Sequence, residues 1–271
     1  WRLAADQALS DGFKLLCLTP PSEALVAEHW SSEGHAIDPS AIRRRLEALR
    51  LAMALALESV MKPLDTLVDE PEQAKHYQPS GPAAGRRALQ HLAQSLVTLL
   101  SPSLDRAEQL LKRYLAATNM TRRMACLSGL VSLQGIAPQP CQAALDDFLK
   151  HYHDNDLALD KWFTVQVATV RLHDTEGLDL LATVQSLLHH PRYDLGSPNR
   201  IRSLLGPFFM QVSPGFHRSD GAGYVLWREQ LASLASRNSQ LASRLARSAN
   251  EGNAFIYNLQ RVLDEIEATD V

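Results

Sequence analysis

Apolar residues recur every three or four positions along most of this chain, and this spacing constrains the fold more than any other feature. The clearest segment begins at Asp38 and Pro39, which suit the cap and the first turn of a helix. It continues through Ile42, Leu46, Leu49, Met53, Leu57 and Val60. No stretch alternates apolar and polar residues for long enough to indicate a β-strand. The sequence therefore predicts an all-α protein.

The predicted helices are similar in length and are joined by short connections. Besides the helix over 38–60, they cover 3–16, a segment ending at Trp30, 89–100, 104–115, 121–133, 140–152, 156–167, 178–188, 197–210, 224–234, 239–248 and 255–266. Helices joined in this way pack each on its predecessor. We therefore expect a superhelical stack of antiparallel helix pairs, as in HEAT and armadillo solenoids, although no strict sequence repeat accompanies it.

The domain organisation follows from the same pattern. With 45% hydrophobic residues, a chain of 271 residues can bury a large core, and we expect a single α-helical domain over 1–271. The polar stretch 63–82 is rich in proline and is expected to be a long loop or hinge. The chain starts at Trp1 without an initiating methionine, and we therefore expect it to be a piece of a longer protein.

Charge and composition argue against several classes of partner. The formal net charge is -3, and no run of Lys and Arg is interleaved with aromatic residues, so we expect no nucleic-acid partner. The longest apolar run, 51–57, is far too short to cross a bilayer, and we expect no membrane partner. Cys17, Cys126 and Cys141 have no CxxC spacing. They are expected to be reduced thiols in the core, which favours the cytoplasm.

Motifs for catalysis are missing from the sequence. None of the ten histidines lies in an HExxH motif, and neither a GxSxG motif nor a P-loop occurs. His189 and His190 precede Pro191 and fit the end of a helix, where partly cationic imidazoles are favourable. Gly221 and Gly223 indicate a turn. We therefore expect neither catalytic residues nor a metal site within this chain.

Two arginines lie where a predicted helix begins. Ser197 and Pro198 suit its cap and first position, which places Arg200 and Arg202 near its N-terminus. The helix dipole disfavours cations there, so a compensating partner is expected. Either each arginine pairs with a carboxylate of a neighbouring helix, or one of them faces a cavity and holds an anionic group of a ligand.

A second polar stretch, 237–244, supplies further donors. Asn238 or Ser239 can cap a helix, and either cap places Gln240 and Arg244 one turn apart on the same face. Together with Arg202 they would form a polar, cationic surface. The residues alone therefore predict a groove that prefers anions.

Five groups of residues occur together in one order along the chain. They are Asn119-Met120-Thr121, Asp160-Lys161-Trp162-Phe163, Ser197-Pro198-Asn199-Arg200-Ile201-Arg202-Ser203-Leu204, Phe216-His217 with Asp220-Gly221-x-Gly223-Tyr224, and Ser236-Arg237-Asn238 with Ala242-Ser243-Arg244-Leu245. In this order and spacing they resemble the C-terminal helical domain of bacterial aminopeptidase N. The resemblance extends more weakly over 1–115.

The resemblance implies a zinc aminopeptidase of the gluzincin kind, whose HExxH zinc site lies on an upstream catalytic domain that this chain lacks. In that family the helical domain closes over the catalytic cleft. By carry-over, Arg202, Gln240 and Arg244 would border the internal cavity and bind the part of a peptide beyond the scissile bond. Zinc would be the cofactor of the catalytic domain, and the partners would be that domain and peptide substrates.

Two hypotheses of different classes follow. The first is a non-catalytic domain that caps the active site of a peptidase removing N-terminal amino acids from peptides, with the chain alone inactive. The alternative is a free-standing helical-repeat scaffold that binds other proteins on its concave face.

Overall fold

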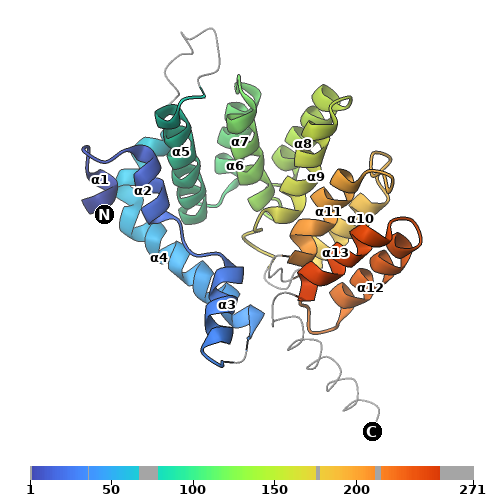
Figure 1. The fold of residues 1–271 in the computed structure, drawn as a ribbon. Helices are drawn as coiled ribbons and strands as arrows, with labels where there is room; N and C mark the ends of the chain where they lie inside the picture. Colours follow the sequence, from blue (N-terminus) through green and yellow to red (C-terminus); the bar gives the residue numbers. More distant parts are fainter. Residues whose placement is uncertain (1, 36, 67–78, 175–177, 211–214, 251–271) are drawn as a thin grey trace. The chain divides into compact units, whose positions relative to one another are not determined.

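The computed structural model describes residues 2–35, 37–66, 79–174, 178–210 and 215–250. The helices in these ranges are α1 (Arg2–Ala5), α2 (Asp11–Leu18), α3 (Glu23–Ser32), α4 (Pro39–Thr66), α5 (Gly81–Leu100), α6 (Leu104–Leu115), α7 (Met120–Ser132), α8 (Pro138–Tyr152), α9 (Asp156–Ala168), α10 (Leu178–Leu188), α11 (Pro198–Met210), α12 (Ala222–Ala235) and α13 (Ser239–Asn250) (Figure 1). The described residues form no strand, which confirms the all-α prediction. No helix within these ranges combines the length and the apolar character needed to span a membrane. The helix predicted over 255–266 lies outside them.

Polar side chains cap several of the helices. Ser103, Asn119 and Asn155 each accept a hydrogen bond from the backbone N–H three residues further on, at 2.9–3.1 Å. Such caps satisfy donors that the first turn of a helix leaves unpaired. Because Asn119 is the cap, α7 begins one residue before the predicted start at Thr121.

The first predicted helix, 3–16, is two helices in the structure. After α1 the carboxylate of Asp6 accepts a hydrogen bond from the backbone N–H of Ala8 at 2.8 Å. Ser10 then caps α2 by accepting from the N–H of Phe13 at 3.3 Å. These side chains offer the backbone a local alternative to a continuous helix, and this outweighs the apolar spacing.

The loop or hinge predicted at 63–82 differs from the structure at both ends. α4 continues through Pro63 to Thr66, and α5 begins at Gly81 with Pro82 in its first turn. Proline is tolerated in a first turn because its missing N–H would have no partner there. Pro63 lies one turn from the end of α4, so its cost to the helix is confined to the last turns. The remainder, 67–78, lies outside the described residues.

Contacts divide the chain into two compact units, which are described separately. Unit 1 comprises Trp1–Pro20, Leu46–Phe148 and Arg171–His173, and unit 2 comprises Pro21–Arg45, Leu149–Val170 and Asp174–Val271. The expectation of a single domain over 1–271 stays a prediction.

In unit 1, α2 packs on α5, α5 on α7, and α6 on α7. One part of its core consists of Ala4, Ala54, Leu57, Met61, Ala93 and Leu96. α2 and α5 approach each other closely at two glycines, because a Cβ on Gly85 would lie 2.7 Å from the backbone nitrogen of Gly12. Small residues thus set the spacing between the first helices of this unit.

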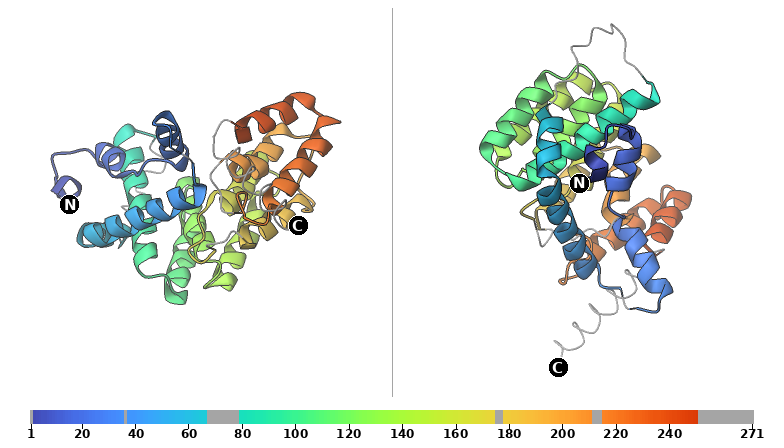
Figure 2. Two further views of the ribbon diagram at one scale, coloured as in Figure 1. Left: turned by 90° about the horizontal axis from the view of Figure 1, so that it is seen from below. Right: turned by 90° about the vertical axis from the view of Figure 1, so that its left-hand side faces the viewer.

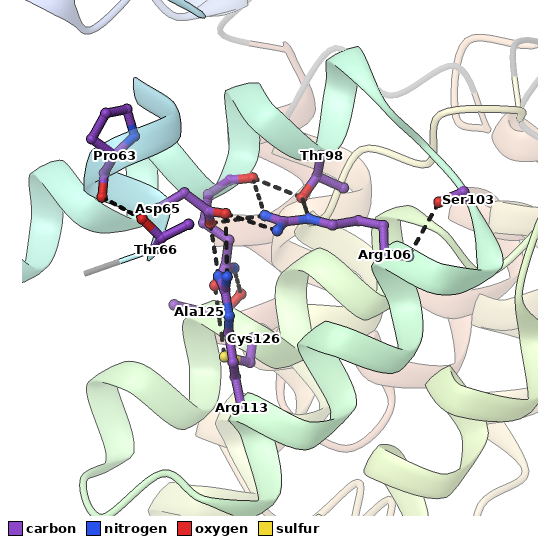
Figure 3. A network of polar contacts seen from close by, with 10 residues as sticks. Pro63, Asp65, Thr66, Thr98, Ser103, Arg106, Arg113, Ala125 and Cys126 are labelled. Carbon is purple, nitrogen blue, oxygen red and sulfur yellow. Dashed lines mark hydrogen bonds and ion pairs between the residues drawn. The ribbon is translucent and has the colours of Figure 1, made fainter. Parts of the chain in front are cut away.

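A buried ion-pair network ties α4 to α6 in unit 1 (Figure 3). The Arg106 guanidinium donates to both carboxylate oxygens of Asp65, at 2.8 and 2.9 Å, and Arg113 donates to the same carboxylate at 2.8 Å. Arg106 also donates to the hydroxyl of Thr98 and to the backbone carbonyl of Gln94 on α5. Burial alone would raise the pKa of Asp65, but the hydrogen bonds and charges of the two arginines outweigh it and hold the pKa below its ordinary value.

In unit 2, α11 packs on α9, on α10 and on α13, and α12 packs on α13. α12 and α13 lie side by side in Figures 1 and 2. The start of α12 rests directly on the preceding backbone, since a Cβ on Gly223 would lie 2.2 Å from the carbonyl oxygen of Phe216. Gly221 has a φ of 72°, the left-handed conformation that glycine adopts without strain. The two glycines of the predicted turn therefore allow the start of α12 to pack closely on the backbone at Phe216.

A neutral histidine lies in the core beside this turn. His217 is 9% exposed, and its Nδ1 lies 2.9 Å from the hydroxyl of Tyr224. Burial lowers the pKa of His217 to about 4. The imidazole is therefore uncharged in the folded protein at neutral pH.

The cysteines divide into two kinds. Cys126 and Cys141 are buried free thiols, as predicted. Cys17 is exposed, so its prediction as a core thiol is wrong. The reason is that Cys17 lies on the solvent-facing side of α2 together with Phe13 and Leu16, which are 48% and 75% exposed.

We expect Asp65→Asn to destabilise the folded chain by about 3 kcal/mol or more, because the substitution leaves a buried guanidinium without its charge partner. Arg113→Ala should cost less, about 1–2 kcal/mol, because Arg106 keeps the carboxylate. Urea unfolding at pH 7 measures both. Equal losses for the two variants would contradict the central place of Asp65.

We also expect the free energy of unfolding to fall as the pH is lowered, because acid protonates His217. Its folded pKa lies below the ordinary value, so its contribution is complete above about pH 6.5 and declines as the pH falls toward 4. Between pH 7 and pH 5 this one group should remove about 2 kcal/mol. His217→Gln should lose that part of the pH dependence, as measured by urea unfolding at the two pH values. An unchanged difference would contradict a neutral, buried imidazole.

Candidate functional site

Arg200 is a buried residue that holds α11 on a neighbouring helix. The residue is 3% exposed, and its Nε donates to the carboxylate of Asp160 on α9 at 2.7 Å. Its Nη1 donates to the backbone carbonyl of Arg192 at 2.5 Å, and its guanidinium carbon lies 5.2 Å from the centre of the Phe163 ring. Of the two predicted alternatives, pairing with a carboxylate of a neighbouring helix is therefore correct for Arg200.

A second carboxylate contacts Arg200 from a more exposed position. Asp156 accepts from Nη2 at 3.2 Å, but its side chain is 87% exposed, whereas that of Asp160 is 18% exposed. Water screens an exposed ion pair strongly and a partly buried one much less. Asp160 is therefore the partner that holds α11 on α9.

Two histidines follow the end of α10, and His190 lies near Arg200. His189 Nδ1 lies 2.8 Å from the carbonyl oxygen of Gln185, in agreement with the predicted role at a helix end. His190 instead packs against the ring of Trp162, with centroids 5.1 Å apart. Burial, and then the nearby charges of Arg192 and Arg200, lower the pKa of His190.

Arg202 lies on a different side of α11 from Arg200. Two positions along a helix correspond to a rotation of about 200°, and Arg202 is exposed while its neighbours Ile201 and Ser203 are buried. No hydrogen bond or ion pair joins Arg202 to another described residue. Among the described residues, pairing with a carboxylate is therefore seen for Arg200 and not for Arg202, and a ligand contact of Arg202 stays a prediction.

α13 presents Gln240 and Arg244 on its exposed side. Asn238 is the cap of this helix, since its Oδ1 accepts a hydrogen bond from the backbone N–H of Leu241 at 2.9 Å. Leu241, Ala242 and Leu245 are buried. Gln240 and Arg244 are exposed one turn apart, and neither makes a hydrogen bond or ion pair with another residue that the structure describes.

The structure thus brings Gln240 and Arg244 together on one helix and places Arg202 on the helix packed beside it. All three side chains are exposed. Two guanidinium groups and an amide, all donors, suit an anionic group or carbonyl oxygens. Whether the three converge on one ligand stays a prediction.

No metal centre accompanies these donors in the described part of the chain. Within it, no group of three or more His, Cys, Asp or Glu side chains is arranged to hold a metal ion. The described residues therefore do not fit a zinc site, and no chemical step through zinc is assigned to them.

Several other residues of the five sequence groups hold the helices together. Asp160 and Phe163 hold Arg200, and Gly223 and Tyr224 pack the start of α12 against Phe216. α12 in turn packs on α13, which carries Gln240 and Arg244. Sequence reasoning did not find the pairing of Arg200 with Asp160, because 40 residues separate them and no local pattern links the two.

We expect Asp160→Asn to cost about 2 kcal/mol or more of folding stability, because it leaves the buried Arg200 without its nearest charge partner. Asp156→Asn is the matched control, since it removes a carboxylate from the same guanidinium at an exposed position and should cost about 0.5 kcal/mol or less. Thermal and urea unfolding measure both variants. A larger effect for Asp156→Asn would contradict the assignment of Asp160 as the anchor.

Comparison with known proteins gives a consistent family. The family described as "Domain of unknown function (DUF3458_C) ARM repeats" matches residues 2–265. Its repeat architecture confirms the prediction of an all-α helical-repeat solenoid.

The curated relatives include two aminopeptidases of similar identity. Aminopeptidase N of Escherichia coli (strain K12) is 32% identical over 249 residues, which cover 89% of this chain and 26% of that protein. Aminopeptidase N of Caulobacter vibrioides is 30% identical over 244 residues, with 90% and 26% covered. The chain thus spans about a quarter of the length of the curated relatives it matches.

A solved structure agrees in fold. Legionella pneumophila aminopeptidase A, crystallised in complex with aspartic acid, superposes with a TM-score of 0.76 at 22% identity. The superposition covers 98% of this chain and 30% of that one. The chain therefore belongs to the family of DUF3458_C ARM-repeat domains, and it matches the C-terminal helical domain of aminopeptidase N.

Proposed function

We propose that this chain is the C-terminal capping domain of a zinc-dependent aminopeptidase N, which removes N-terminal amino acids from peptides. In this role it encloses the active-site cavity and contributes peptide-contacting residues. The observation that carries the proposal is that nearly the whole chain matches aminopeptidase N proteins that are about four times as long. The partners are then the catalytic domain of the same polypeptide and peptide substrates.

The division of labour between the two parts follows from the residues present. Zinc, held by the catalytic domain, would polarise the water that attacks the peptide bond. The described residues of this chain offer donors and no metal-binding cluster. This chain therefore binds and orients the peptide and limits access to the cavity.

Arg202, Gln240 and Arg244 are the residues to which we assign peptide contacts. A guanidinium group binds a carboxylate in a bidentate way, which suits the free C-terminus of a short peptide. Gln240 can donate its amide N–H to a backbone carbonyl of the peptide. Their exposure supports this role, because neither arginine has a carboxylate partner among the described residues.

We also propose a cytoplasmic location for the parent enzyme. Two buried free thiols support a reducing compartment. Burial raises the pKa of Cys126 to about 11 and that of Cys141 to about 12, so both stay protonated at neutral pH.

In the full-length enzyme, we expect the double variant Arg202→Ala/Arg244→Ala to raise the KM for di- and tripeptides about tenfold, with little change in kcat or zinc content. The reason is that these donors hold a part of the peptide that does not react, so they contribute equally to ground-state and transition-state binding. Steady-state kinetics on free and C-terminally amidated tripeptides provide the measurement. Amidation should raise the KM of the native enzyme and have little further effect on the variant.

The matched control is Arg228→Ala on α12, an exposed arginine of the same unit. Its kinetics should equal those of the native enzyme. An unchanged kcat/KM for short peptides in the double variant would contradict the proposed peptide contacts. The alternative of a free-standing scaffold is distinguished by the reading frame upstream of Trp1, where a domain carrying HExxH favours the peptidase.

A further inference from the structure

The part of α4 that belongs to unit 1 is apolar on two opposite sides. Ala48, Leu51, Ala52, Leu55 and Ala56 on α4 recur at steps of three and four residues, and all five are exposed. We call them the outer stripe. Leu51 is 45% exposed and Leu55 is 60% exposed. α4 can be followed along its length in Figure 2.

The opposite side of α4 is covered. Ala54, Leu57 and Met61 are 0–4% exposed and pack with Ala93 and Leu96 of α5. At 100° per residue, these positions lie about 180° around the helix from the centre of the outer stripe. The apolar side that forms the core is therefore distinct from the apolar side that is exposed.

A single exposed leucine needs no explanation, but a continuous row at helical spacing does. A helix that is apolar on both sides is normally buried on both sides. The outer stripe contains no charged residue; Glu47 and Glu58 lie along one edge of it, and Arg44 and Arg45 lie on the same side of the helix one turn before Ala48. The stripe therefore suits a dry, apolar partner surface.

The composition of the stripe indicates how a partner would fit. Alanine alternates with leucine along the stripe, so the leucine side chains project and the alanines between them leave shallow grooves. Small residues let a second helix approach closely, while the leucines on either side fill its grooves. A flat polar surface would gain nothing from this pattern.

We propose that the outer stripe of α4 is the docking site for the part of the parent polypeptide that lies outside this chain. This inference rests on the proposed function and names the surface that joins the two parts. The occupant follows from length, since about three-quarters of the Escherichia coli relative has no counterpart in this chain. Because that part would be covalently linked to this chain, it would be present at high effective concentration in every copy of the protein.

Hydrogen–deuterium exchange tests the proposal. The amides of 48–59 should exchange about tenfold more slowly in the full-length protein than in the 271-residue chain, because a docked partner suppresses local opening of the helix. Equal rates in the two proteins would overturn the proposal. Strong protection already present in the 271-residue chain would also overturn it, because the stripe would then be covered within this chain.

Variants identify the surface. Leu51→Gln/Leu55→Gln should return the exchange of 48–59 in the full-length protein to the rate of the 271-residue chain. Leu104→Gln is the matched control, since Leu104 is 49% exposed on α6 of the same unit; it should leave the protection intact. Neither change should lower the Tm of the 271-residue chain by more than about 2 °C, because the altered side chains are exposed there.

A second copy of the chain is the competing occupant. Analytical ultracentrifugation of the 271-residue chain should show a monomer, and a dimer that Leu51→Gln/Leu55→Gln dissociates would overturn the proposal. The outcome is separable from that of the proposed function. Protection of α4 with unchanged kinetics for the Arg202 and Arg244 variants would support the docking surface and contradict the peptide contacts.

Discussion

The buried ion pair between Arg200 and Asp160 is the interaction on which the candidate site depends. It fixes α11 on α9, with the guanidinium against Phe163. Because two residues correspond to roughly half a turn, burying Arg200 turns Arg202 toward solvent. Two arginines two positions apart in one helix thus take different roles, Arg200 as an anchor and Arg202 as an exposed donor. α13, packed on α11, adds Gln240 and Arg244.

Unit 1 contains a similar buried ion pair at the end of α4. Asp65 accepts from Arg106 and Arg113, and Arg106 also reaches the backbone of α5. Helix packing by apolar residues is weakly directional, whereas a buried guanidinium with several fixed partners has one satisfactory arrangement. In both units an arginine from a later helix fixes an earlier one. The outer stripe of α4 is exposed on the side opposite the buried core residues of the same helix, which is why we assign it to a partner.

Much of the fold could be predicted from the sequence, because helix periodicity and capping are local. The helix over 104–115 is an example, since α6 has these bounds in the structure. The predictions that were wrong involve competition or distance: Ser10 divides the first helix, Pro63 is accommodated within α4, and Cys17 is exposed. For the site, the sequence could indicate that Arg200 and Arg202 lie near the start of a helix and need a compensating anion, either a carboxylate of the protein or a ligand. It could not assign the roles, because Asp160 lies 40 residues away.

The central claim is that this chain supplies cationic side chains to a peptide whose hydrolysis takes place on another domain. The most direct measurement is a crystal structure of the full-length protein with a bound tripeptide or a non-hydrolysable analogue. The account predicts that the guanidinium groups of Arg202 and Arg244 lie within hydrogen-bond distance of the peptide's carboxylate or carbonyl oxygens. A bound peptide with both guanidinium groups directed into bulk solvent would contradict it.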